Sequence, residues 1–386
     1  MATQRYRLEI LSPLHIGSGQ EYGVFDGVFQ NGRWYLIDIE KVLTRSREDP
    51  TNLANAMMQS GFNWASWLQR RNIPPQEVAA RAVVCHQNPA QTKIRACIRD
   101  PFGRPYIPGS TLKGAIRTAI LEWLVLDLGE EKRRRLAQKV VQRDERGRLS
   151  PREWVGRETV ERELLIGRGR GNESNRDLLR ALHISDSEPI DPDKVQIGLV
   201  WVYTLRGNRL EQKRVGNEEY KMFLEWLPTS VETRLTITLD EGLLQGTAKA
   251  DLGFSNQQKE ALHGFIDACN KRASSLIESE QGFYKKDYGL SAIAQFYGRL
   301  HQRLNQVETQ GGFLLNIGWG GGWKAKTVTN PLTEGLDEEF EQIRRLYKLG
   351  KRDTDVFPKT RRVAFRNNQP HAPLGWVALI PEGGTS

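Results

Sequence analysis

Apolar and polar residues alternate at the start of the chain, in RYRLEIL (5–11). Such alternation is typical of a strand with one buried face. The segments YGVFDGVFQ (22–30) and RWYLIDI (33–39) then flank Asn31-Gly32, a dipeptide that favours the tight turn of a hairpin. We therefore expect the glycine-rich segment LSPLHIGSGQEYG (11–23) to connect two strands.

Helical periodicity follows. Residues 51–71 space their apolar residues as a helix does, and they end before Pro74-Pro75, which cannot continue a helix. A periodic apolar run from Leu112 to Leu126 predicts another helix. Ser110 precedes this run and is the candidate N-cap, because its hydroxyl would lie near the free N–H groups of the first turn.

Residues 127–178 are dense in charge and poor in apolar residues, which predicts an insertion that is part helical and part mobile. Further strands are expected in RAVVCH (81–86), KIRACI (93–98), VQIGLVWVYTL (195–205), EYKMFLEWLP (219–228), VETRLTITL (231–239), GGFLLNIGWGGGW (311–323), FPKTRRVAF (357–365) and PLGWVALI (373–380), and further helices at 256–277, 291–307 and 337–349. Strands and helices mix without regular alternation, so we expect an α+β architecture of two antiparallel sheets.

Composition adds a first indication of function. The 386 residues are 38% hydrophobic, which is enough for real cores, and 56 Lys and Arg against 47 Asp and Glu give a net charge of +9. A polyanion is therefore the leading class of partner. The alternative is that a modest excess of basic residues only keeps the protein in solution.

The number of cysteines and the length of the apolar runs indicate the cellular compartment. Cys85, Cys97 and Cys269 are too few and too scattered for a disulfide framework, and no C-x-x-C pair is present. The opening MATQRYRLEILSP is a charged strand rather than a signal core, and no stretch approaches 18 apolar residues. We expect a reducing, cytoplasmic setting and no membrane.

Two glycine clusters fail the spacing tests for nucleotide cofactors. Gly17-x-Gly19-x-x-x-Gly23 has one residue too many for the dinucleotide fingerprint, and PGSTLKGA (108–115) lacks the phosphate-loop spacing. A more general function remains, because glycine admits a phosphate close to the backbone and Lys113 and Arg117 share one helical face. The alternative is a capped core helix with two solvated cations.

The C-terminal glycine cluster IGWGGGWKAKT combines flexible backbone, stacking surface and cations, which suits a single-stranded nucleic acid. It contains Gly318, Gly320, Gly321, Gly322, Trp319, Trp323, Lys324, Lys326 and Thr327. The alternative is a glycine-rich turn with buried tryptophans. Arg361 and Arg362 follow in FPKTRRVAF, and in a strand they point to opposite faces.

Candidates for catalysis are sparse. Six histidines are scattered, and none stands in a metal-binding motif. His15 could serve a metal-independent ribonuclease as general base or acid, but the sequence offers no evident second catalytic group. Asp186 in HISDSEP indicates a turn or strand end. His15 either packs under its loop or stacks on a base, and the flanking Leu14 and Ile16 favour packing.

Five motifs, taken in order, resemble the RAMP superfamily of CRISPR proteins, and most closely the filament-capping subunits of type III-A (Csm) effector complexes. The motifs are LSPLHIGSGQEYG (11–23), YIPGSTLKGAIRTA (106–119), LHISDS (182–187), GWGGGWKAKT (318–327) and FPKTRR with PLGWV (357–377). Each motif is degenerate, but their order is specific and covers nearly the whole chain.

The resemblance implies two ferredoxin-like, RRM-like modules, at 1–126 and 179–386, around the charged insertion. It implies a non-catalytic subunit that caps the backbone filament at the 3′ portion of the CRISPR RNA and assists maturation of that end, without metal or cofactor. Expected partners are CRISPR RNA, the backbone RAMP subunit, the small subunit and host nucleases. The alternatives are a metal-independent RNA-processing endoribonuclease with His15 catalytic, and a subunit of a type III-B complex.

The glycine-rich motifs and the cations near them are the expected RNA contacts. They are His15, Gly17, Ser18, Gly19, Ser110, Lys113, Arg117, Gly320, Gly321, Gly322, Trp323, Lys324, Lys326, Thr327, Arg361 and Arg362.

Overall fold

A computed structural model describes residues 2–90, 92–141, 151–245, 251–285, 289–350 and 356–383. Its first sheet is antiparallel and has five strands in the order β14-β17-β1-β13-β7. The strands are β1 (Ala2–Ile10), β7 (Leu182–Ile184), β13 (Glu232–Leu239), β14 (Phe313–Asn316) and β17 (Trp376–Pro381). The predicted alternation in β1 is confirmed, because Tyr6, Leu8 and Ile10 are buried.

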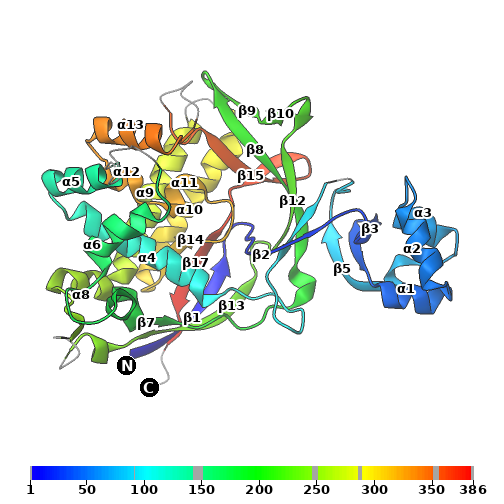
Figure 1. The fold of residues 1–386 in the computed structure, drawn as a ribbon, viewed down its shortest axis with the longest axis horizontal. Helices are drawn as coiled ribbons and strands as arrows, with labels where there is room; N and C mark the ends of the chain where they lie inside the picture. Colours follow the sequence, from blue (N-terminus) through cyan, green and yellow to red (C-terminus); the bar gives the residue numbers. More distant parts are fainter. Residues whose placement is uncertain are drawn as a thin grey trace.

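The first sheet joins distant parts of the chain. Its strand β1 lies between β13 and β17, so the segments 1–126 and 179–386 both contribute strands to it. The start of β1 and the end of β17 consequently lie near one another at one end of this sheet (Figure 1).

The second sheet has ten strands, in the order β2-β6-β12-β8-β5-β4-β3, with β15 and β9 paired to β8 and β16 paired to β15. The strands are β2 (Gly17–Tyr22), β3 (Gly27–Gln30), β4 (Arg33–Ile37), β5 (Ala79–Cys85), β6 (Ile94–Cys97), β8 (Gln196–Arg206), β9 (Arg209–Gln212), β12 (Lys221–Trp226), β15 (Thr360–Arg366) and β16 (Gln369–Ala372); β10 (Arg214–Val215) and β11 (Glu218–Glu219) form a separate ribbon.

The expectation of a purely antiparallel second sheet was wrong. Strand β6 runs parallel to β12, and β5 runs parallel to β8. Strands β5 and β6 lie in the long connection that follows β1, whereas β8 and β12 lie in the connection between β7 and β13. The paired strands are therefore not joined by a hairpin, which would force them to be antiparallel. The expected α+β class itself is confirmed.

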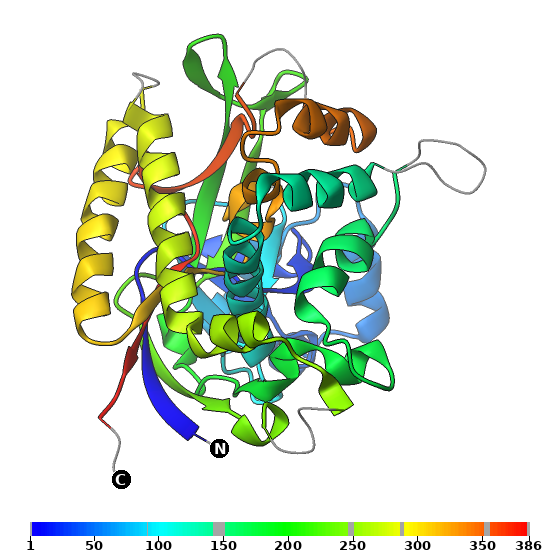
Figure 2. The same ribbon diagram turned by 90° about the vertical axis from the view of Figure 1, so that its left-hand side faces the viewer.

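Helices cover one face of the first sheet, and Figure 2 looks onto this layer. The layer contains α4 (Gly109–Leu126), α8 (Asn256–His263), α9 (Phe265–Lys285) and α10 (Ser291–Thr309), with α5 (Glu130–Val140), α6 (Arg162–Leu165), α11 (Gly322–Lys326), α12 (Thr329–Leu332) and α13 (Asp337–Leu346) around it. Phe265 of α9 packs edge-on against Phe313 of β14, which packs against Tyr6. The helix predicted at 256–277 is two helices, because Gly264 ends α8.

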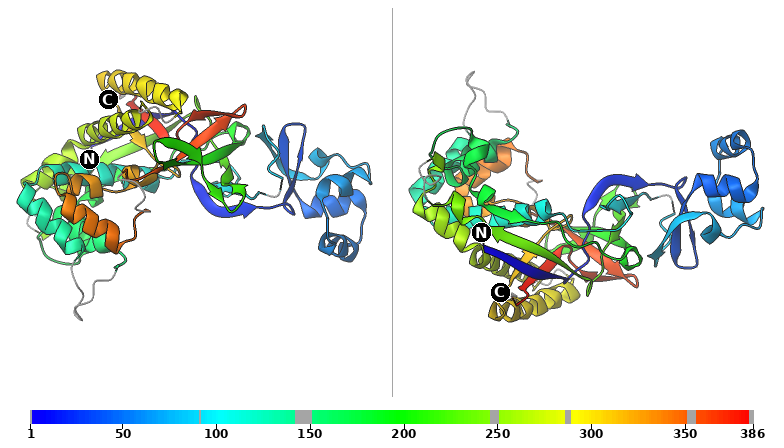
Figure 3. Two further views of the ribbon diagram at one scale, coloured as in Figure 1. Left: turned by 90° about the horizontal axis from the view of Figure 1, so that it is seen from above. Right: turned by 90° about the horizontal axis from the view of Figure 1, so that it is seen from below.

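A small lobe projects from one end of the second sheet (Figure 3). It contains β3, β4, α1 (Ile39–Ser46), α2 (Pro50–Met58) and α3 (Trp64–Gln69), and it has a core of its own around Trp64 and Trp67. The predicted hairpin turn is confirmed, since Asn31 and Gly32 both have positive φ between paired strands.

The predicted N-cap of α4 was wrong. The capping residue is Pro108, and Ser110 lies exposed inside the first turn without a capping bond. The Gly109 N–H instead donates to the Asp186 carboxylate at 2.8 Å. A residue 77 positions away therefore satisfies this helix start, which a local motif could not reveal.

The insertion packs as helices on this layer, with α5 against α13 and α6 against α4. Residues 142–150, where part of the predicted mobility falls, lie outside the described residues. The three cysteines are free and buried. Within the described residues, no helix is both long and apolar enough to cross a bilayer.

Three connections interlock where adjacent strands of the first sheet end. The Trp319 N–H donates to the His15 carbonyl at 2.8 Å, and the Gly375 N–H donates to the Pro13 carbonyl at 3.0 Å. The Ile317 N–H donates to the Gly375 carbonyl at 2.7 Å. We call residues 317–323 the glycine loop. Its position is thus set by backbone contacts to the segments that follow β1 and precede β17.

We expect Gly318→Ala to destabilise the protein by at least about 2 kcal/mol more than Gly322→Ala. Both glycines have positive φ, 67° and 78°, so both substitutions carry a strain of about 1 kcal/mol. A Cβ at Gly318 would lie 2.5 Å from the His15 carbonyl oxygen, whereas one at Gly322 meets no heavy atom within 4 Å. Urea unfolding midpoints measure the difference, and equal losses would contradict the interlock.

Candidate nucleic-acid interface

A cleft of about 760 Å³ lies beside the glycine loop, and residues of β8, of β15 and of the segment after α13 line it. Seven cationic side chains line it: Arg206, Lys213, Arg214, Lys326, Lys348, Lys359 and Arg362. No Asp or Glu of the described chain lines it. We call it the basic cleft, and a lining whose charged side chains are all positive attracts anions.

Aromatic rings share the basic cleft with these cations. The guanidinium carbon of Arg362 lies 4.8 Å from the centroid of the Trp319 ring, and that of Arg95 lies 5.5 Å from it. Trp323 packs edge-on against Phe357 with 5.6 Å between centroids. Cations held against indole rings contribute cation–π energy and keep a flat surface next to positive charge. Such a surface suits bases stacked along a phosphate backbone.

His15 supports the glycine loop from below. Its side chain is 2% exposed, its Nδ1 lies 2.6 Å from the Glu225 carbonyl oxygen, and its ring meets Trp319 edge-on. Burial lowers the pKa of His15, so the ring is neutral at neutral pH. The packed interpretation of His15 is confirmed. Among the described residues, no three His, Cys, Asp or Glu side chains gather as a metal site requires.

A buried carboxylate lies beneath His15. Glu225 is fully buried and accepts from Arg81 at 2.9 Å, from Arg99 at 3.4 Å and from the Cys97 N–H at 3.0 Å. These bonds hold β12, β5 and β6 together directly under the histidine. A buried charge paired in this way is costly to break, so the node makes the base of the site rigid.

The first glycine motif lies outside the basic cleft. Gly17, Ser18 and Gly19 are exposed on β2, and the Ser18 hydroxyl donates to the Ala96 carbonyl at 3.4 Å. A Cβ at Gly17 would lie 3.1 Å from the His15 ring nitrogen Nε2. The motif is therefore packed against His15, and His15 in turn touches the glycine loop.

The cations of α4 also lie outside the basic cleft. Arg117 pairs with Glu161 at 2.7 Å and with Asp177 at 2.8 Å, so its charge attaches the insertion to α4. Lys113 is half-buried, and burial lowers its pKa. Neither residue lines the basic cleft, and Arg117 is ion-paired rather than the solvated cation of the alternative. The phosphate site at this helix start stays a prediction.

Arg361 and Arg362 point to opposite faces of β15, as the alternation predicted. Arg361 donates to Glu280 at 2.6 Å and lies 4.0 Å from the centroid of the Phe283 ring, on the helical side. Lys324 turns to that side as well and donates to the Ser279 hydroxyl. Only Lys326 and Arg362 among the predicted cations line the basic cleft, with Gly320, Gly322 and Trp323.

Two further predicted residues line neighbouring cavities. Gly321 faces the Arg361 side, and Thr327 lies under α12. The cations that the sequence analysis missed come from the β8–β9 hairpin, from Lys348 and from Lys359. The run RGNRLEQKR (206–214) was the available signal, because it places four Lys and Arg residues close to the glycine of a hairpin turn.

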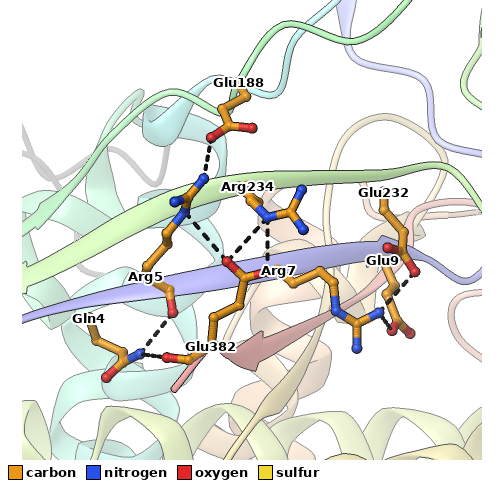
Figure 4. Close-up of polar contacts among 8 residues, drawn as sticks. All are labelled: Gln4, Arg5, Arg7, Glu9, Glu188, Glu232, Arg234 and Glu382. Carbon is orange, nitrogen blue, oxygen red and sulfur yellow. Dashed lines mark hydrogen bonds and ion pairs between the residues drawn. The ribbon is translucent and has the colours of Figure 1, made fainter. Parts of the chain in front are cut away.

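The open face of the first sheet differs from the basic cleft in that its arginines are paired with glutamates. Arg5 pairs with Glu188 at 2.7 Å, Arg7 with Glu232 at 2.9 Å, and Arg234 with Glu382 at 2.9 Å (Figure 4). The outward residues of β1 are therefore paired charges rather than the aromatic platform by which RRM sheets stack bases. The basic cleft, by contrast, is lined by seven cations and by no Asp or Glu of the described chain.

Comparison with known proteins agrees with this geometry. The model of the RAMP superfamily matches residues 7–323. The CRISPR system Cms protein Csm5 of Streptococcus thermophilus is 26% identical over 264 residues, which cover 62% of this chain and 65% of that protein. The protein of the same name from Methanocaldococcus jannaschii is 23% identical over 411 residues, covering 98% of this chain and 88% of that one.

Two solved structures share the fold. One chain of a Csm–crRNA–target RNA ternary complex from a type III-A CRISPR-Cas system, solved by cryo-EM, superposes with a TM-score of 0.71 at 23% identity and covers 99% of this chain and 100% of that one. The crystal structure of Csm5 from T. onnurineus superposes with a TM-score of 0.64 at 22% identity, covering 96% and 99%.

His15 makes stability depend on pH. Because its pKa in the folded chain lies below its ordinary value of 6.5, the unfolded chain takes up the proton first as pH falls. The stabilisation is complete above pH 6.5 or so and is lost progressively below it, at no more than about 1.4 kcal/mol per pH unit. We expect His15→Gln to flatten the fall in unfolding midpoint between pH 7.5 and 5.5.

The exposed His183 provides the matched control. His183→Gln should keep the pH dependence of the unmodified chain. If His15→Gln and the unmodified chain lose stability in parallel as pH falls, His15 is not the buried neutral group described above.

Proposed function

Because the chain belongs to the RAMP superfamily, we propose that it is a non-catalytic RNA-binding subunit of a type III-A CRISPR effector complex, with the RNA strand in the basic cleft. The observation that carries the proposal is the cleft itself, with seven cations, no acidic residue of the described chain, and Trp319 and Trp323 on its surface. The Csm5 relatives and the shared fold with a chain of a Csm–crRNA complex support it.

Binding of this kind rests on phosphate neutralisation and base stacking. Phosphates release counterions when Lys and Arg neutralise them. The slope of log K against log salt for a single strand is therefore about −0.7 for each phosphate that the protein contacts. Stacking on an indole tolerates every base. The cleft should therefore hold RNA with little preference for sequence, as suits a subunit that carries variable guides.

The first sheet supports a ferredoxin-like module. The sequence of elements β1, α4, β7, β13, α9 and β17 follows the β-α-β-β-α-β order of that module. We propose that its RNA contacts come from the connections at the strand ends and not from its open face. A second such module in the second sheet, and folding units that end near residues 126 and 178, stay predictions.

We further propose a place in the complex. The chain would cap the filament of backbone RAMP subunits at the 3′ portion of the CRISPR RNA, next to the small subunit, and would position that end for maturation by host nucleases in the cytoplasm. The match to the Methanocaldococcus relative covers 98% of this chain and 88% of that protein, which supports a common role. A type III-B complex is the alternative, and native mass spectrometry of the co-purified subunits decides between them.

Reversal of two cleft charges should weaken RNA binding without regard to sequence. We expect Lys326→Glu with Lys348→Glu to lower affinity about ten-fold or more at low salt, equally for unrelated single strands, and to reduce the salt slope by roughly 0.7 per lost contact. Lys194→Glu changes an exposed lysine far from the cleft lining and serves as control. Unchanged affinity in the double variant would refute the cleft assignment.

The enzyme alternative makes a separate prediction. Purified protein incubated with CRISPR repeat RNA in EDTA should leave the RNA intact over hours, because His15 is buried, neutral and outside the basic cleft. Gel analysis of end-labelled RNA measures this. Cleavage at a defined site that His15→Ala abolishes would instead establish a metal-independent endoribonuclease.

A further inference from the structure

An apolar pocket of about 450 Å³ opens beside the basic cleft. The insertion supplies one wall with Val140, Val155 and Val160, and α12 and α13 supply the opposite wall with Leu332 and Ile343. Tyr347 completes that wall, and its hydroxyl donates to the Val140 carbonyl at 3.0 Å. A cavity of this size and composition, with few polar groups, is typical of a site for a small, largely apolar ligand group.

The pocket adjoins the basic cleft. Trp323, Lys326 and Leu349 line both cavities. Lys326 is exposed at this border, where it can meet a phosphate, and the Trp323 ring forms an aromatic edge between the two cavities. A strand in the basic cleft therefore passes next to the apolar pocket.

The charge around the pocket admits a polyanion. Glu161 is the single acidic residue of the described chain that lines it. Its carboxylate shares Arg117 with Asp177, at 2.7 and 2.8 Å, so this cluster keeps one net negative charge. Lys326 also lines the pocket and offsets that charge at the border with the basic cleft.

We propose that this pocket, which we call the base pocket, takes up one unstacked nucleobase of the RNA strand that lies in the basic cleft. The inference rests on the proposed function. A nucleobase that leaves its stack has flat, weakly polar faces that pack against the aliphatic walls and the edge of the Trp323 ring. Its phosphate remains outside at Lys326. The base pocket gives the charged insertion a role, since the insertion builds one wall of it.

Gly156 allows the pocket to be filled without disturbing the fold. It lines the pocket, its backbone is right-handed helical with φ −61° and ψ −42°, and a Cβ there would meet no heavy atom within 4 Å. Gly129 is the matched control, because it lies in the same insertion, also has open space around its Cα, and does not line the pocket. The variants are Gly156→Leu and Gly129→Leu.

The test is a scan with RNA strands that each lack one base. Affinities are measured for the full chain, alone or in its reconstituted complex, with a single strand carrying one abasic nucleotide at successive positions. For the unmodified chain we expect one position at which base removal lowers affinity about five-fold or more, a loss typical of a buried stacked base. Gly129→Leu should keep this position.

In Gly156→Leu, removal of the base at the same position should no longer lower affinity. Intact RNA should bind to this variant about as weakly as the abasic strand binds to the unmodified chain. This non-additivity connects the base to the pocket. A flat scan with strong binding of intact RNA would overturn the base pocket alone and leave the proposed function standing. Equal sensitivity in Gly156→Leu would also overturn the base pocket.

Two other results separate the remaining explanations. If Gly156→Leu releases a neighbouring protein subunit while the RNA scan is flat, the pocket holds an apolar side chain of a partner and the proposal is wrong. If the unmodified chain binds no RNA either alone or in its complex, the proposed function fails and the base pocket fails with it.

Discussion

The site depends on the close backbone contact among three connections at one end of the first sheet. β14, β17 and β1 are neighbours in that sheet, so the segments that follow β1 and β14 and precede β17 converge there. Hydrogen bonds between main chains then hold the glycine loop to the His15 segment, with no room for a Cβ at Gly318. Glycine is required here for close approach as well as for positive φ. The loop that faces the basic cleft is consequently a rigid extension of the sheet, supported by His15 and by the buried Glu225 node.

Charge is divided between two surfaces with opposite character. On the open face of the first sheet, arginines and glutamates form pairs whose charges cancel, and exposed pairs of this kind contribute little energy. In the basic cleft, cations from β8, the residues that follow β9, α11, β15 with the residue before it and the segment after α13 gather, and no Asp or Glu of the described chain is among the lining residues. The excess of nine positive charges over the whole sequence is modest. Its effect on a polyanion depends on this local concentration, and two tryptophans convert an electrostatic surface into one that can also stack bases.

Local sequence patterns predicted individual strands, turns and helices. They could not predict which residues from distant segments come together in the fold. The alternation in β1, the Asn31-Gly32 turn and the periodicity of α4 and α10 follow from short-range rules, so the sequence was sufficient for them. The Gly109 N–H at the start of α4 is satisfied by Asp186, and the cleft cations come from distant segments, so no window of sequence contains them. Arg117 and Lys324 matched a phosphate-binding pattern but are bound to Glu161 and Ser279. Residue type and spacing identified the glycine loop, whereas only tertiary contacts distinguish the cations that line the basic cleft from those that hold the structure together.

The central claim is that RNA lies in the basic cleft and not on the open face of the first sheet. Photocrosslinking tests it most directly, with single-stranded RNA that carries 4-thiouridine at successive positions, the full chain, and mass spectrometry of the crosslinked peptides. Crosslinks should fall on residues 318–326, 356–362 and 206–214, which border the cleft. Crosslinks concentrated on Arg5, Arg7 and Arg234, in the paired charges of β1 and β13, would contradict the account.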